Sequence, residues 1–146
     1  ADFDSIVVNE PYPRGLMRPI PYGKQIRLTS FQKNTGLAVE SNGLFAGTPA
    51  IFTVVDLKLG RVALKAGQSY VNVGRDGRVT LEAPKPDAAQ SFQWIETPTG
   101  ELVLMSLATN RFLRIDPKTQ TITCDSPGPL PDGSDGVRFV WMFATK

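Results

Sequence analysis

Polar and aromatic side chains gather around two turn-forming stretches of the sequence, "RDG" at residues 75–77 and "DPKT" at residues 116–119. A planar guanidinium beside a carboxylate offers the paired donors and acceptors that vicinal hydroxyl groups need. An aromatic ring nearby adds an apolar face, and the three groups together can recognise a pyranose ring. The candidate residues for such a binding site are Tyr70, Asn72, Arg75, Asp76, Arg78, Phe112, Arg114 and Asp116.

The same residues also fit a simpler interpretation. Arginine and aspartate on a solvated face form ion pairs that are worth about 0–1 kcal/mol each, and Tyr70 and Phe112 would then form a hydrophobic rim. At the positions that match the two stretches, an earlier part of the chain has Gly36 and Ala38, which cannot bind a sugar. We therefore expect any glycan site to lie between residues 61 and 146.

The residue types argue against catalysis. The chain has no histidine and one cysteine, Cys124, which excludes Ser-His-Asp and Cys-His nucleophile pairs and every histidine-ligated metal site. The acidic stretch "PDGSDG" at residues 131–136 lacks the alternating ligands and the terminal Glu of a calcium loop. A glycosidase needs two carboxylates across a cleft, and no pair stands out among the 14 acidic residues. We expect no enzymatic activity, no metal and no cofactor.

Composition narrows the class of partner further. The 146 residues suit one domain, and the net charge of +2 comes without any run of Lys or Arg. This gives no electrostatic footprint for nucleic acid or for an anionic membrane surface. No apolar stretch approaches the length of about 18 residues that a transmembrane helix needs. We expect neither nucleic acid nor a membrane as a partner.

Three stretches of the chain, at residues 24–60, 61–100 and 101–146, alternate apolar residues with a period of two, which marks half-buried strands. Each stretch contains four such segments. The residues expected to face the core are Ile26, Leu28, Leu37, Val39, Phe45, Gly47, Phe52, Val54, Val62, Leu64, Val71, Val73, Val79, Leu81, Phe92, Trp94, Leu102, Leu104, Leu113, Ile115, Ile122, Cys124, Phe139 and Trp141. We therefore expect both tryptophans in the core and Cys124 as a buried, unreactive thiol.

The spacing between segments supports three copies of one unit. Eight residues separate the last inward position of one copy from the first of the next in both cases. The turn formers "SNG", "RDG" and "DPKT" follow the second segment of each copy, and Asn-Gly and Asp-Gly are strong hairpin signals. Three four-stranded units close around a threefold axis with one shared core and short edges. The sequence predicts an all-β fold, a β-trefoil with three four-stranded pseudo-repeats.

The pattern "VALKA…SYVNVGRDGRVTLEA…SFQW" resembles the fascin-like branch of the β-trefoils. The second and third copies match this pattern well and the first more loosely, over residues 25–143. The chain lacks the Gln-x-Trp signature of the sugar-binding ricin-type trefoils, since its nearest string is Gln93-Trp94. The resemblance implies a trefoil scaffold and leaves the chemistry of any site open.

Residues 1–21 stand outside the repeats and carry four prolines, Pro11, Pro13, Pro19 and Pro21. The string "FDSIVVNEP" resembles the closing strand of a jelly-roll domain of the kind found in modular sugar-acting enzymes. An N-terminal strand followed by an extended, proline-rich arm that lies against the trefoil is the preferred interpretation. We place the trefoil at residues 22–146.

These observations predict a non-catalytic carbohydrate-binding module for a polysaccharide or oligosaccharide, secreted or periplasmic, as a monomer or as part of a larger glycoside-active enzyme. The alternative is a protein-interaction trefoil, either a protease inhibitor or a cytoskeletal binder. An inhibitor needs a long exposed loop, for which residues 125–138 are the candidate.

Overall fold

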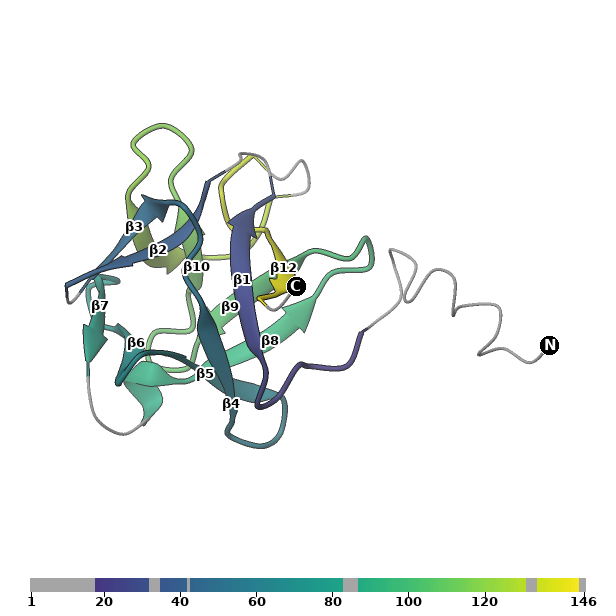
Figure 1. Cartoon of the computed structure of the whole chain (residues 1–146). Coiled ribbons are helices and arrows are strands. Elements are labelled where there is room, and N and C mark those ends of the chain that lie inside the picture. The colour runs from purple at the N-terminus through teal and green to yellow at the C-terminus, as the bar shows by residue number, and fades with distance from the viewer. Residues whose placement is uncertain (1–17, 32–34, 42, 83–86, 131–133, 145–146) are drawn as a thin grey trace.

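The computed structural model describes residues 18–31, 35–41, 43–82, 87–130 and 134–144. Figure 1 shows these segments as strands joined by short turns. Six strands form a barrel: β1 (Gln25–Ser30), β4 (Phe52–Asp56), β5 (Arg61–Ala66), β8 (Phe92–Glu96), β9 (Leu102–Ser106) and β12 (Phe139–Phe143). Each pairs antiparallel with the next, and β12 closes the ring on β1, so the barrel leaves no open edge.

Three hairpins cap one end of the barrel. They are β2–β3 (Gly36–Glu40 and Gly43–Gly47), β6–β7 (Ser69–Val73 and Val79–Glu82) and β10–β11 (Phe112–Ile115 and Ile122–Ser126). One barrel pair and one hairpin come from each sequence copy, and the threefold arrangement is that of a β-trefoil, as predicted. Within the described part of the chain, the helical structure consists of a single turn of 3₁₀-helix, η1 (Ala88–Gln90).

The core agrees with the predicted inward positions in copies two and three. All of them are buried in one cluster except Ile122, which is partly buried against it. Trp94 and Trp141 are 6% and 4% exposed, and Cys124 is fully buried, which confirms three core predictions. Period-two alternation identified these positions because each strand of the barrel and cap has one face toward the threefold axis.

The predicted register of β3 is wrong by one residue. Phe45 is 42% exposed, while Leu44 and Ala46 pack against the core. In the β2–β3 hairpin Glu40 pairs with Gly43, so Val39 lies opposite Leu44 and their side chains share the inner face. The predicted inward positions Val39 and Phe45 imply a turn as long as that of the β6–β7 hairpin, whereas the β2–β3 turn is shorter. A slip of one residue turns every side chain to the other face.

Only the last residues of the predicted N-terminal arm belong to the described structure. Residues 18–21 have no strand, and the expected strand at the start of the arm lies outside the described residues. The Arg18 guanidinium lies 4.0 Å from the centre of the Trp141 ring and 3.5 Å from Glu96 Oε2. This end of the arm therefore lies against the barrel beside β12, where Figure 1 shows the dark purple segment leading into β1.

Candidate functional site

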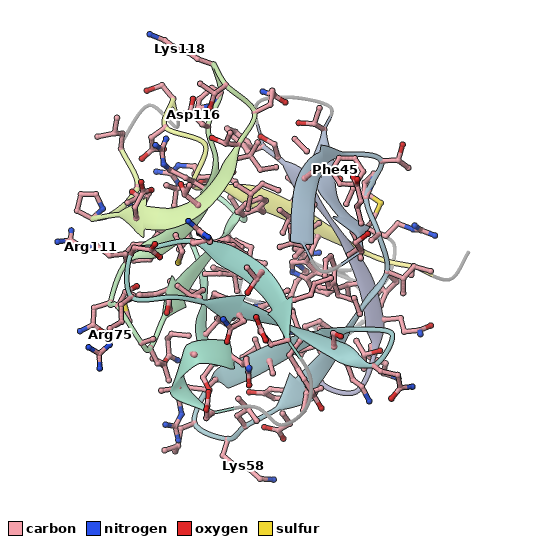
Figure 2. The ribbon with its side chains drawn as sticks, turned by 90° about the vertical axis from the view of Figure 1, so that its left-hand side faces the viewer. Phe45, Lys58, Arg75, Arg111, Asp116 and Lys118 are labelled. Atoms are coloured by element: carbon pink, nitrogen blue, oxygen red, sulfur yellow. The ribbon has the colours of Figure 1, made fainter. Side chains whose placement is uncertain are left out.

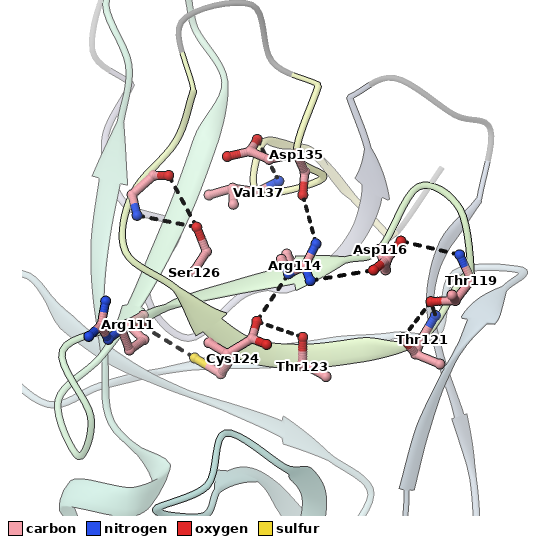
Figure 3. Close-up of polar contacts among 12 residues, drawn as sticks. Arg111, Arg114, Asp116, Thr119, Thr121, Thr123, Cys124, Ser126, Asp135 and Val137 are labelled. Atoms are coloured by element: carbon pink, nitrogen blue, oxygen red, sulfur yellow. Dashed lines mark hydrogen bonds and ion pairs between the residues drawn. The ribbon is translucent and has the colours of Figure 1, made fainter.

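The third copy holds an arginine fixed between two carboxylates on the outer face of its hairpin. Arg114 follows the buried Leu113 on β10, so alternation points its side chain outward. Its Nε donates to Asp125 Oδ1 at 3.0 Å, and one terminal nitrogen donates to Asp116 Oδ2 at 3.4 Å. The other donates to the Asp135 carbonyl at 3.4 Å. Figure 3 shows Arg114 at the centre of these contacts, and its guanidinium plane is thereby fixed.

Both carboxylates are held ionised. Backbone N–H groups of Lys118 and Thr119 donate to Asp116 Oδ1 at 2.8 and 3.2 Å, and these bonds lower the pKa of Asp116. For Asp125, partial burial acts to raise the pKa, but hydrogen bonds from Arg114 and Thr123 outweigh it and the pKa lies below its ordinary value. At neutral pH both side chains therefore act as hydrogen-bond acceptors.

A hollow of about 260 Å³ opens beside Arg114. The loop after β11 forms its wall, and its lining residues are Arg114, Asp125, Ser126, Pro127, Gly128, Leu130 and Asp135. Ser126 Oγ and the Asp135 carboxylate hold this loop by accepting the backbone N–H groups of Gly128 and Leu130 at 3.2 and 2.9 Å. Leu130 is 48% exposed, so the hollow combines the apolar side chains of Pro127 and Leu130 with a guanidinium and two carboxylates.

The "RDG" turn of the second copy forms another hollow, of about 320 Å³, against the third copy. Its lining residues are Arg75, Asp76, Gly77, Thr109, Arg111, Cys124 and Asp125. Asp76 Oδ1 accepts the Arg78 N–H at 3.0 Å and so shapes the turn. Figure 2 shows Arg75 and Arg111 on the same edge of the molecule, both directed toward solvent. Neither guanidinium has a polar partner among the described residues.

The remaining predicted residues lie apart from the two hollows. Asn72 Nδ2 donates to Thr80 Oγ1 at 3.3 Å, and Asn72 Oδ1 accepts from Gln90 Nε2 at 3.1 Å, so this amide links β6 to η1. The Lys65 ammonium lies 5.9 Å from the Tyr70 ring. Phe112 is half-buried and belongs to neither lining. Arg78 is exposed at the end of the turn.

The structure thus places Arg75 and Asp76 at one hollow and Arg114 at the other, and it joins Asp116, which lines neither, to Arg114. It adds Asp125, which lines both hollows and which sequence reasoning missed. Asp125 directly follows the buried Cys124, and alternation along β11 alone would have placed it outward. Arg111 and Leu130 were missed for a different reason, since they come from turns that carry no periodic signal.

A third hollow, of about 690 Å³, is largely apolar and lies beside the end of the arm. It is lined by Arg18, Pro19, Ile20, Pro21, Tyr22, Lys24, Trp141 and Phe143. Beneath it, Trp141 Nε1 donates to Glu96 Oε2 at 2.7 Å, and the Glu96 side chain is 2% exposed. The face of the Trp141 indole is covered by Arg18, so this ring is not free to stack on a sugar.

The described residues contain no group of three or more side chains that could hold a metal ion, and they form no helix with the length and apolar character of a membrane span.

The comparisons with known proteins concern the fold. No protein-family model matches the chain, and no curated protein matches it either. Among solved structures, the designed threefold-symmetric protein ThreeFoil is similar with a TM-score of 0.67 and 16% identity, over 81% of this chain and 97% of that one. A GH43 β-1,3-galactosidase gives a TM-score of 0.74 and 13% identity, over 100% of this chain and 33% of the enzyme.

A GlcNAcα1-4Gal-releasing endo-β-galactosidase from Clostridium perfringens gives a TM-score of 0.68 and 12% identity, over 84% of this chain and 33% of the enzyme. The match thus spans a third of the length of each glycosidase. At these identities the similarity establishes the β-trefoil fold and nothing finer.

Proposed function

We propose that this chain is a non-catalytic carbohydrate-binding module, of the fascin-like branch that its repeats resemble, and that it serves a larger glycoside-active enzyme. The observation that carries the proposal is the guanidinium of Arg114, fixed between Asp116 and Asp125 at the rim of an open hollow. Paired donors and acceptors in a fixed plane match the vicinal hydroxyl groups of a sugar.

The geometry also suggests how strong such a site would be. Because Arg114 is already held in place, little side-chain freedom is lost when a ligand binds. The hollows are nevertheless small and open, at or near the lower end of the range of about 300–1,000 Å³ for small-molecule sites. We expect a dissociation constant of about 0.1–1 mM for a short sugar, about −5.5 to −4 kcal/mol.

Two circumstances support the module role. The fold occurs within two proteins that are named as glycosidases, and this chain matches a third of each. The chain has no histidine to act as a general base, which suits binding without catalysis. A polysaccharide partner further implies a secreted or periplasmic protein.

The protein-interaction alternative is favoured by the apolar hollow of about 690 Å³, where Phe143 is 53% exposed. Aromatic side chains in an open apolar hollow are typical of protein contacts. This surface is separate from the polar hollows in its lining residues, so variants can distinguish the two functions.

A glycan array probed with the folded protein tests the proposal, followed by titration of the wild type, Arg114→Lys and Arg61→Lys. Lysine keeps the positive charge but loses the planar fork, so Arg114→Lys should raise the dissociation constant at least tenfold. Arg61 is the matched control because its Nε donates to the Lys58 carbonyl at 3.2 Å and it lines none of the hollows described above. If the protein binds no glycan on the array, the proposal is overturned. If Arg114→Lys binds its glycan as tightly as the wild type, the binding site lies elsewhere on the protein.

A further inference from the structure

The two polar hollows share one carboxylate. Asp125 lines the hollow beside Arg114 and also the hollow beneath the "RDG" turn. Its Oδ1 atom accepts from Arg114 Nε at 3.0 Å and from Thr123 Oγ1 at 2.9 Å, while no described residue donates to its Oδ2 atom. The side chain is 49% exposed. One oxygen of Asp125 therefore fixes the side chain, and the other has no donor among the described residues.

The backbone holds the hollows at a fixed separation. The Cys124 N–H donates to the Gly77 carbonyl at 2.8 Å, and Arg78 bridges to Thr123. Gly77 has a φ of +86°, and a Cβ atom there would lie 3.2 Å from the Cys124 carbonyl oxygen and 3.3 Å from Asp125 Cβ. A side chain at this φ would be strained, and its Cβ atom would fit only if these neighbours moved by a few tenths of an ångström. The turn of the second copy is thus joined to β11 of the third as one rigid surface.

The volumes leave room for one ligand that extends across both hollows. Each hollow, at about 260 and 320 Å³, lies at or near the lower end of the range of roughly 300–1,000 Å³ that small-molecule sites occupy. The sum of their two volumes falls within that range. A ligand that extends across Asp125 would use both linings, whereas a ligand confined to one would be mostly open to solvent.

The charges of the combined lining balance. The two linings contain three arginines, Arg75, Arg111 and Arg114, and three aspartates, Asp76, Asp125 and Asp135. A single-sign charge on the ligand would meet repulsion from half of these groups, whereas hydroxyl groups can donate to the carboxylates and accept from the guanidiniums. The lining therefore favours an uncharged polyhydroxyl ligand.

We propose that the two hollows form one composite site, centred on Asp125, which binds two adjacent units of a neutral hexose chain. This inference rests on the proposed function and makes it more specific. The sequence predicts separate sites in copies two and three, whereas the composite site spans the boundary between them.

The length of the ligand provides the first test, by calorimetric titration with β-1,3-galacto-oligosaccharides of one to four units. A composite site binds one oligosaccharide per protein, and the affinity should rise at least tenfold from galactose to the disaccharide, because the second unit binds as a tethered group. Beyond three units the gain should be small. Two independent sites would instead bind two disaccharides per protein, with little gain over galactose.

Substitutions on the two sides of the boundary provide the second test. Asp76→Asn changes the hollow of the second copy, Leu130→Ala changes that of the third, and Asp125→Asn changes both. Asp56→Asn is the matched control, because Asp56 Oδ1 accepts the Lys58 N–H at 2.8 Å as Asp76 accepts that of Arg78, yet it lines none of the hollows described above. Thermal unfolding of each variant verifies the fold.

For the composite site, Asp76→Asn and Leu130→Ala each weaken disaccharide binding at least threefold with the stoichiometry still at one, and Asp125→Asn weakens it at least tenfold. Asp56→Asn leaves it unchanged. Two outcomes would overturn the composite site and leave carbohydrate binding intact. The first is a stoichiometry of two that falls to one in Asp76→Asn or Leu130→Ala. The second is unchanged binding by Asp125→Asn. If the oligosaccharides do not bind at millimolar concentration, the composite site is wrong for this chain, and an empty glycan array would remove the proposed function as well.

Discussion

The contact between the "RDG" turn and β11 predicts an unusually large cost for adding one methyl group, in Gly77→Ala. Alanine at a positive φ costs roughly 1–2 kcal/mol relative to glycine. At Gly77 the new Cβ would also lie 3.2 Å from the Cys124 carbonyl oxygen and 3.3 Å from Asp125 Cβ, so the strand or the turn must shift. Overpacking of this kind adds about 1–3 kcal/mol. The total is about 2–5 kcal/mol of unfolding free energy.

Gly67→Ala is the matched control for this substitution. Gly67 also has a positive φ, +61°, but a Cβ atom there would meet no atom of the described residues within 4 Å. It should therefore cost only the backbone term of about 1–2 kcal/mol. The difference between the two variants measures the close approach of the turn to β11.

Urea unfolding followed by tryptophan fluorescence gives both values, since Trp94 and Trp141 are buried in the native state. With an m-value of about 2 kcal/mol/M, the midpoint should fall by roughly 1–2.5 M in Gly77→Ala and by roughly 0.5–1 M in Gly67→Ala. Equal shifts in the two variants would refute the contact and, with it, the fixed separation of the two hollows. If the contact is as described, Gly77→Ala should also weaken oligosaccharide binding in the fraction that remains folded, whereas Gly67→Ala should not.

Three further predictions concern buried and ionised groups. Burial raises the pKa of Cys124 to about 12. A thiol reagent at pH 8 should therefore label the native protein at least a hundredfold more slowly than the urea-unfolded protein. Rapid labelling of the native protein would contradict the burial of this thiol. The folded-state pKa of Asp116 lies below its unfolded value. The stabilisation that Asp116 contributes is therefore present above about pH 4 and is lost as the pH falls through the folded-state pKa. Asp116→Asn should flatten the fall in unfolding free energy below about pH 4, and an unchanged pH dependence would count against the hydrogen bonds from the Lys118 and Thr119 N–H groups. Trp141→Phe removes the donor to Glu96 Oε2, whereas Trp94 Nε1 has no hydrogen-bond partner among the described residues. Trp141→Phe should therefore cost about 1–3 kcal/mol more than Trp94→Phe in urea unfolding, and equal costs would mean that this hydrogen bond contributes nothing.

Much of the candidate site was accessible from the sequence because outward positions follow from the same alternation as the core. Arg114 and Asp116 were identified in this way, and the structure joins them by a hydrogen bond. Asn72 occupies an equivalent outward position, but its amide is bound to Thr80 and Gln90. Alternation predicts on which side of a strand a side chain lies, and it carries no information about what covers that side.

Phe45 illustrates the limit of the repeat argument. Three equivalent repeats predict hairpin turns of similar length, but the β2–β3 turn is shorter, and Phe45 lies at the surface instead of in the core. Turn length is a local property that the other copies do not determine. The register therefore had to come from the pairing of Val39 with Leu44, which the sequence pattern does not specify.

The sequence by itself determined the all-β trefoil, the inward faces of most strands, the places of the turns and the types of side chain available for binding. These properties are local, since each depends on periods of two residues and on turn formers a few residues apart. Only the tertiary structure decided that the turn at Gly77 lies against Asp125, and that the candidate groups of two copies meet at one carboxylate. That contact joins residues almost fifty positions apart through closure of the barrel and its cap, and it depends on the packing of the whole core rather than on any segment of the chain.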